Sequence, residues 1–186
     1  EIGRNLKSIS LDPTCKIDQN AHFFGSLNVM PILSYLKEKS TENDVLFGLE
    51  DFPLDENALK NNLKDMSKII ECPRYGILLD IGHSNLRTTD NEYFKAKGIE
   101  KYLTDIPVPI IELHVHDNKK IGDWHMPPGR GNLDFALVAK TLNKKKFNKI
   151  STIEIAPTRY NSKPENEREA AINGLRYWKS LLERNN

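Results

Sequence analysis

The stretch 110–118 combines an apolar run with side chains that are able to bind a metal ion. In an extended strand alternate side chains lie on the same face, so Glu112, His114 and His116 share one face. Ionisable groups on an otherwise buried strand are costly unless something pairs with them, and a metal ion is a suitable partner for imidazoles. The stretch therefore predicts a strand whose polar face contributes to a metal site.

Four predicted strands each end in a residue of metal-ligand type, and these residues are Glu50, Asp80, His114 and Glu154. Successive members are 30, 34 and 40 residues apart, and each step matches one strand–helix unit of about 30 or more residues. In a (β/α) barrel the carboxyl ends of the strands form the rim where active sites lie. Three carboxylates and one imidazole that meet there cannot all stay charged without a cation between them. Their oxygen and nitrogen atoms suit Mn²⁺, Zn²⁺ or Mg²⁺, so we expect a divalent metal cofactor.

A second set of candidate ligands consists of His83, Asp123 and His125. His83 follows Asp80 by three residues, whereas Asp123 and His125 lie two residues apart in a long loop after the fourth strand. We expect these three to hold a second metal or to face the substrate. Structural roles stay open for single residues, because an acidic residue after a buried strand often caps a helix or forms a salt bridge. His116 has a similar alternative, a hydrogen-bonded histidine beside the site.

Strand and helix patterns alternate along the whole chain. Strands are expected over 7–13, 45–51, 75–80, 109–116 and 150–155, and helices over 27–42, 55–70, 93–103, 135–142 and 165–183. Such alternation implies parallel strands joined by right-handed crossovers. The sequence therefore predicts an α/β fold of the (β/α) TIM-barrel type, in a single domain over 1–186.

The composition narrows the class of partner. The chain is 38% hydrophobic with a formal net charge of +1, so it has no global field for nucleic acid or for an anionic membrane. No apolar run approaches the roughly 20 residues of a membrane helix. Cys15 and Cys72 show no CxxC spacing and are expected to be free thiols in a reducing compartment, which predicts a cytoplasmic protein.

Five short motifs occur in a fixed order. They are Gly48-Leu-Glu50-Asp, Leu79-Asp80-Ile-Gly-His83, Glu112-Leu-His114-Val-His-Asp117-Asn, Asp123-Trp-His125-Met-Pro-Pro-Gly129-Arg-Gly131-Asn-Leu-Asp134-Phe and Ile153-Glu154. In this order they resemble the motifs of the xylose isomerase-like TIM-barrel superfamily, which includes sugar isomerases, sugar epimerases and the endonuclease IV type of abasic-site nuclease. The resemblance covers most of the chain.

The resemblance implies roles for individual residues. The metal ligands that it implies are Glu50, Asp80, His114 and Glu154. The two glutamates would also take and return the substrate proton, as in the epimerases. His83 is similar to a substrate-contacting or second-metal histidine, and Asp123 and His125 are similar to the pair that completes an extra zinc site in the nuclease branch.

Two residues depart from the nuclease pattern. Asp12 stands where the nuclease branch has a histidine on its first strand, which argues against a full trinuclear zinc site. Arg130 stands where that branch often has an acidic residue. An arginine at this place is expected to grip a phosphate or carboxylate of the substrate.

The resemblance begins at the fourth strand of the family, so the fold is expected to be incomplete, with about five of eight units. Five strands cannot close a barrel that needs eight. Uncovered sheet edges invite aggregation. We therefore expect a C-terminal fragment or truncated product that lacks its N-terminal strands, with that missing segment or a second copy in a homo-oligomer covering the open edges.

The favoured function is a divalent-metal-dependent isomerase or epimerase of a small sugar or sugar derivative. The metal would bind adjacent carbonyl and hydroxyl oxygens of the open-chain sugar and lower the cost of an enediolate. Glu50 and Glu154 would then move the proton, and His83 would polarise a substrate oxygen. The residues expected to line the substrate are Trp124, Arg130, Phe52 and His116.

Two other functions stay open. One is a zinc-dependent endonuclease IV-like phosphodiesterase acting on abasic DNA, which the second ligand set favours and the near-neutral charge disfavours. The other is a non-catalytic barrel remnant. The favoured reading predicts a sugar-like small molecule as the partner, without nucleic acid or membrane.

Overall fold

The computed structural model describes residues 8–11, 30–50, 74–90, 92–106 and 109–184. The chain forms two compact units, 1–79 with 106–112 and 80–105 with 113–186. Each unit is described by itself, and the expectation of a single domain stays a prediction. The predicted helix over 55–70 lies outside the described residues, as do Cys15 and Cys72.

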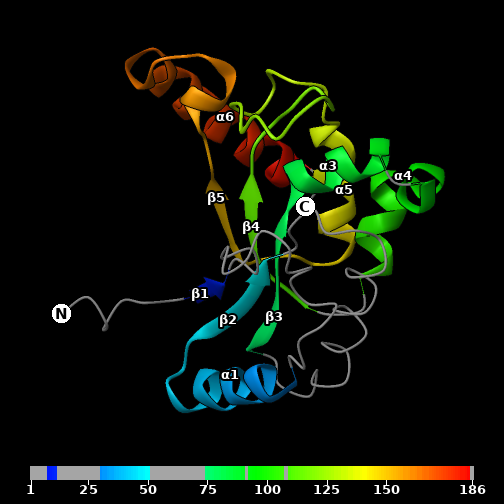
Figure 1. The fold of residues 1–186 in the computed structure, drawn as a ribbon, viewed down its shortest axis with the longest axis vertical. Helices are drawn as coiled ribbons and strands as arrows, with labels where there is room; N and C mark the ends of the chain where they lie inside the picture. Colours follow the sequence, from blue (N-terminus) through cyan, green and yellow to red (C-terminus); the bar gives the residue numbers. More distant parts are fainter. Residues whose placement is uncertain (1–7, 12–29, 51–73, 91, 107–108, 185–186) are drawn as a thin grey trace, which may run out of the picture. The chain divides into compact units, whose positions relative to one another are not determined.

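Strands and helices alternate as the sequence predicts (Figure 1). The elements are β1 (Ser8–Leu11), α1 (Met30–Glu42), β2 (Leu46–Glu50), β3 (Tyr75–Asp80), α3 (Ile81–Asp90), α4 (Glu92–Asp105), β4 (Ile110–Val115), α5 (Phe135–Lys144), β5 (Ile150–Ile153), the 3-10 helix η2 (Pro157–Tyr160) and α6 (Pro164–Arg184). The strands are hydrogen-bonded in chain order from β1 to β5. The fold is thus an α/β fold of the partial (β/α) barrel type.

In the first unit three strands pair in parallel. Ser8 lies opposite Leu46 in the β1–β2 pair, and Phe47 lies opposite Tyr75 in the β2–β3 pair. The Ile77 amide donates to the Pro109 carbonyl oxygen at 2.9 Å, which joins β3 to the residues before β4. This approach requires Gly76, because a Cβ there would lie 2.1 Å from the Pro109 oxygen.

The end of α1 is fixed to the strands by a buried hydroxyl. Ser40 Oγ donates to the carbonyl oxygens of Val45 at 2.6 Å and Arg74 at 3.1 Å. The Arg74 guanidinium also forms an ion pair with Asp44. These contacts hold the turns that lead into β2 and β3.

The strands β4 and β5 point the same way, and the helices α4 and α5 of the second unit lie side by side (Figure 1). The Glu154 amide donates to the Val115 carbonyl oxygen at 3.2 Å, at the ends of these two strands. Residues along β4 alternate between half-buried and buried, so His114 lies on the opposite face to the buried Leu113 and Val115. This alternation places the polar face where the sequence predicts it.

Part of the core of the second unit lies between α5 and α6. Phe135 of α5 and Trp178 of α6 are buried and meet edge to face, with ring centroids 5.9 Å apart. Asp134 caps α5, because its carboxylate accepts from the Leu137 amide at 2.9 Å. In the described part of the chain no helix is both long and apolar enough to cross a membrane.

The helix α3 is a difference from the sequence analysis, which predicted no helix between the third strand, 75–80, and the helix over 93–103. The structure ends β3 at Asp80 and begins α3 at Ile81. The segment after Asp80 is rich in polar residues and lacks an apolar stripe of helical period, so pattern alone does not indicate a helix. A hydrogen bond from the His83 amide to Asp80 Oδ1, 2.9 Å long, caps the helix start.

Candidate metal centre

Four side chains of metal-ligand type gather in the second unit, and we call them the histidine-rich set: His83, His116, Asp123 and His125. One ligand atom of each lies within 4.8 Å of one ligand atom of every other. All three histidines are buried. His83 comes from α3, His116 directly follows β4, and Asp123 and His125 belong to the loop 117–133.

The distances within this set centre on Asp123. Asp123 Oδ1 lies 3.1 Å from His125 Nε2 and 3.5 Å from His83 Nε2. The His116 and His125 rings stack with centroids 3.8 Å apart and an interplanar angle of 7°. The Arg159 guanidinium forms an ion pair with Asp123 from the side of η2. Three imidazoles therefore surround one carboxylate, which also forms an ion pair with an arginine.

A second gathering, which we call the strand-end set, consists of Asp80, His114 and Glu154. Glu154 Oε2 lies 3.1 Å from His114 Nδ1, and their ligand atoms and one of Asp80 lie within 4.8 Å of one another. Asp80 Oδ1 also lies 2.9 Å from His116 Nε2, while Glu154 Oε2 lies 3.4 Å from His125 Nδ1. The two sets are thus neighbours, linked by the contacts of Asp80 with His116 and of Glu154 with His125.

The donor atoms fit a divalent metal ion. His116 Nδ1, Asp123 Oδ1, His125 Nδ1 and Glu154 Oε2 are buried, yet none of these four atoms makes a hydrogen bond. Buried polar atoms normally have partners, so a cluster of atoms without them requires an explanation such as an ion. Imidazole nitrogens mixed with carboxylate oxygens are a donor set that suits Zn²⁺ or Mn²⁺.

Charge pairing shifts the titration of both sets. Burial raises the pKa of Asp80, but the nearby charges of His83 and His116 outweigh burial and bring that pKa down to about 2. Burial also opposes ionisation of Asp123 and Glu154, yet their histidine partners hold both pKa values well below the usual range. These carboxylates are therefore anions at neutral pH.

His125 titrates in the opposite sense. Burial lowers its pKa, but the neighbouring carboxylates of Asp123 and Glu154 outweigh burial and raise that pKa to about 9. Without a metal the ring carries a proton at neutral pH. A metal ion would take the place of that proton, because metal ligation requires the neutral imidazole.

The backbone at His125 is unusual. His125 has a φ of 49°, a left-handed conformation that few residues other than glycine adopt. Its carbonyl oxygen accepts from the Ala156 amide at 3.1 Å, and its neighbour Met126 pairs with Asp117. Such conformations persist only where the surroundings fix them, and they cluster at functional sites.

The structure brings six of the predicted site residues into these two sets: Asp80, His114 and Glu154 in one, and His83, Asp123 and His125 in the other. His116, predicted to line the substrate, lies between them against Asp80. Glu50 ends β2 in the first unit, and its part in the metal site stays a prediction. Phe52 and Asp12 lie outside the described residues.

The remaining predicted substrate residues lie on the loop 117–133. Trp124 is half-buried, and its amide donates to the Gly122 carbonyl oxygen at 3.0 Å. The Arg130 guanidinium pairs with Glu167 of α6 at 2.7 Å. Contact of either residue with a substrate stays a prediction.

Sequence reasoning missed the residues that hold this loop. Asp117 and Asn118 are buried and receive or make most of its side-chain hydrogen bonds. The sequence does contain a sign of this role. An Asp-Asn pair directly follows β4, and two glycines, Gly129 and Gly131, lie where the loop returns. Polar loop residues give no periodic pattern, so their partners cannot be read without coordinates.

Comparisons with known proteins identify the family of the chain and its fold. Residues 28–181 match the sequence profile of the family described as Xylose isomerase-like TIM barrel. The chain is 32% identical over 130 residues to the uncharacterized protein MJ1311 of Methanocaldococcus jannaschii, a match that spans 68% of this chain and 42% of that protein.

Solved structures share the fold at low sequence identity. A D-tagatose 3-epimerase-like protein matches with a TM-score of 0.64 and 22% identity, over 96% of this chain and 63% of that one. The IolI protein with a bound zinc atom matches with a TM-score of 0.64 and 15% identity, over 97% of this chain and 64% of that one. The chain thus spans less than two thirds of these relatives.

Proposed function

Since the chain belongs to the xylose isomerase-like TIM barrel family, we propose that the protein is a divalent-metal-dependent isomerase or epimerase of a small sugar or sugar derivative. The observation that carries the proposal is the pair of adjoining ligand sets with buried, unsatisfied donor atoms. The fold alone would not select a reaction, because one barrel hosts many. The similar structures include an epimerase-like protein and a zinc-binding one, which supports this choice.

In this proposal the strand-end set holds the metal, and Glu50 is the fourth ligand that strand spacing predicts. When bound, the ion polarises adjacent carbonyl and hydroxyl oxygens of an open-chain sugar. Asp80 serves as a fixed anion, since it is buried and also caps α3. His114 holds Glu154 in place through the 3.1 Å contact between Nδ1 and Oε2.

Glu154 is the proposed base. Its side chain is 39% exposed, so a substrate has access to it, whereas Asp80 is fully buried. Its lowered pKa keeps it ionised at neutral pH, the form in which it would accept a proton from the carbon next to the carbonyl group, but the same shift makes it a weaker base. Glu50 is the proposed partner that returns a proton, and His83 the donor to a substrate oxygen.

A second candidate function is supported by the histidine-rich set. If this set also holds a metal, the protein has the ingredients of a zinc phosphodiesterase, in which two ions stabilise the attacking and leaving oxygens. The formal net charge of +1 gives little electrostatic attraction to a DNA backbone. The isomerase is therefore the preferred proposal, with the phosphodiesterase as its competitor.

Solvent-proton exchange tests the proposal directly. The purified chain is loaded with Mn²⁺, Co²⁺ or Zn²⁺ and incubated in D₂O with a panel of ketoses and aldoses, and loss of the C–H signal is followed by NMR. We expect exchange by the unaltered chain and its loss in Glu154→Gln. Glu165→Gln is the matched control, because Glu165 is exposed at the start of α6.

Two results would contradict the isomerase. One is stoichiometric metal binding without exchange of any sugar in the panel. The other is nicking of an abasic-site oligonucleotide by the metal-loaded chain, which would instead support the phosphodiesterase.

A further inference from the structure

Asp117 is a buried carboxylate outside both ligand sets, and it makes an unusually large number of contacts with backbone amides. Its Oδ1 accepts from the amides of Asn118 at 2.8 Å and Leu133 at 3.2 Å. Its Oδ2 accepts from Gly131 at 2.7 Å and Gly129 at 3.1 Å. A carboxylate has about four acceptor positions, so backbone amides occupy all of them.

The two glycines allow the returning part of the loop to come this close. A Cβ at Gly131 would lie 2.1 Å from the Asn118 carbonyl oxygen and 2.2 Å from Asp117 Oδ1. Gly129 has a φ of 88°, which residues with a side chain rarely adopt. The residues 129–133 are therefore shaped to wrap around one carboxylate.

The backbone of Asp117 also fixes the outgoing part of the loop next to a metal-ligand residue. The Asp117 amide donates to the Met126 oxygen at 2.7 Å, and the Met126 amide donates back at 2.9 Å. Met126 follows His125, the residue with the left-handed backbone. Asp117 thus contacts both the returning segment 129–133 and the segment that contains Met126, which follows Asp123 and His125 along the loop.

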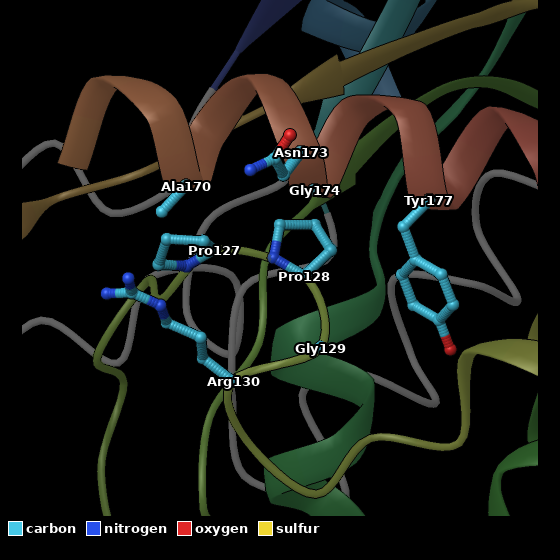
Figure 2. Close-up of a pocket in the computed structure, with 8 residues that line it drawn as sticks. All are labelled: Pro127, Pro128, Gly129, Arg130, Ala170, Asn173, Gly174 and Tyr177. Carbon is cyan, nitrogen blue, oxygen red and sulfur yellow. The ribbon is translucent and has the colours of Figure 1, made fainter.

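The outer side of the same loop packs on α6, as Figure 2 shows for Pro127–Arg130 beneath the helix. Pro128 lies so close to the helix that a Cβ at Gly174 would come within 2.7 Å of its Cδ. Arg130 pairs with Glu167, which also accepts from Ser162 Oγ at 2.6 Å. A cavity of about 460 Å³ remains between the two surfaces. The loop is therefore held from inside by Asp117 and from outside by α6.

From this we infer that Asp117 is a positioning residue: its carboxylate folds the loop 117–133 into the one shape that presents Asp123 and His125 to His83. It acts through backbone amides and does not bind the metal itself. The inference requires that the histidine-rich set binds a divalent ion, which the proposed isomerase does not itself need. It holds whichever reaction the protein catalyses.

Cobalt binding tests the inference, with Asp117→Asn as the main variant. An asparagine keeps one acceptor oxygen and turns an amide group toward two N–H donors, so two hydrogen bonds are lost. Loss of an outer partner of a ligand typically costs about 10- to 100-fold in metal affinity. We expect Co²⁺ to bind the histidine-rich set about 10- to 100-fold more weakly, with a changed visible spectrum. His125→Ala identifies which absorption belongs to that set.

The metal-free protein supplies a second readout. The Gly129, Gly131 and Leu133 amides should exchange with D₂O faster in Asp117→Asn, whereas amides of α5 should not change. Asp134→Asn is the matched control, because Asp134 is an exposed aspartate directly after the same loop and its carboxylate accepts from the Leu137 amide. It should leave cobalt affinity unchanged.

Gly131→Ala keeps the carboxylate but displaces the loop from it, and should weaken cobalt binding as Asp117→Asn does. The inference is overturned if a folded Asp117→Asn binds Co²⁺ with unchanged affinity and spectrum, or if the unaltered chain binds no Co²⁺ through His125. It is also overturned if both variants are unfolded, since Asp117 would then serve overall stability. Failure of sugar exchange alone would overturn the proposed isomerase and leave this inference standing.

Discussion

The strand-end set and the histidine-rich set both gather candidate metal ligands, but the backbone that positions these ligands differs. Asp80, His114 and Glu154 lie at or next to the ends of strands, where the backbone is fixed by the sheet. Asp123 and His125 lie on a long loop, and the returning part of that loop is held by the buried carboxylate of Asp117. The comparison shows that an irregular loop becomes a precise support for ligands when a buried carboxylate satisfies its amides.

The largest expected effect is the loss of metal binding when one histidine is removed from either set, and this loss distinguishes the two sets. His114→Ala should abolish sugar exchange and metal binding by the strand-end set, while His125→Ala should abolish only binding by the histidine-rich set. Each loss of a ligand should exceed the roughly 10- to 100-fold that an outer partner costs. Titration with Co²⁺ and NMR exchange would check both. Equal loss of all metal in both variants would show that the sets form a single cooperative centre.

The next effect is the pH dependence of the histidine-rich set. A metal ion must displace the proton of His125, whose pKa is raised to about 9, so affinity should rise about tenfold per pH unit up to about pH 9. The metal-free protein should behave in the opposite way. Because the native state raises this pKa, the stability that it contributes is full below about pH 6.5 and is lost as pH rises through about 9.

Thermal unfolding from pH 6 to pH 9 would show both trends: the stability of the metal-free protein should fall as pH rises, and the stabilisation by Zn²⁺ should grow. His125→Gln is the control, since it cannot be protonated and its unfolding should lose this pH dependence. A metal affinity that does not vary with pH in the unaltered chain would contradict the assignment of the proton to His125.

A smaller effect is expected where His116 packs on α3. A Cβ at Gly82 would lie 2.1 Å from the His116 ring, so Gly82→Ala must displace the ring from Asp80. Overpacking of this kind costs about 1–3 kcal/mol. Urea unfolding of the metal-free chain would measure it, and unchanged stability together with unchanged cobalt spectra would show that the ring position is not required.

The smallest effect is expected at the end of the loop, away from both sets. Asp134→Ala removes the cap of α5 and should lower the free energy of unfolding by about 1 kcal/mol. Metal affinity should not change. A large loss of metal would mean that α5 and the loop 117–133 are coupled more tightly than their hydrogen bonds indicate.

The sequence predicts the strand-borne part of this molecule well, for a physical reason. Alternation along β4 and the spacing of strand–helix units fix which side chains share a face and an edge, so the gathering of Asp80, His114 and Glu154 follows from local pattern. The family resemblance, and with it the partial (β/α) barrel, rests on the same motifs.

The parts that escaped prediction depend on contacts between residues far apart in sequence. The helix α3 has little apolar periodicity and owes its start to the Asp80 cap. The roles of Asp117 and of the Arg130–Glu167 pair depend on loop shape, which no periodic pattern encodes. Glu50 was selected by the same spacing as Asp80, and its contribution to the metal site remains for experiment.

Through the contact between Pro128 and Gly174, the helix α6 can affect the position of the loop that carries Asp123 and His125. Any residue larger than glycine at position 174 would act as a wedge and push the 127–130 segment outward. A substitution near the carboxyl end would then look like a defect in metal loading, although it touches no ligand. Substitutions in α6 are therefore expected to change metal binding indirectly, through the position of the 127–130 segment.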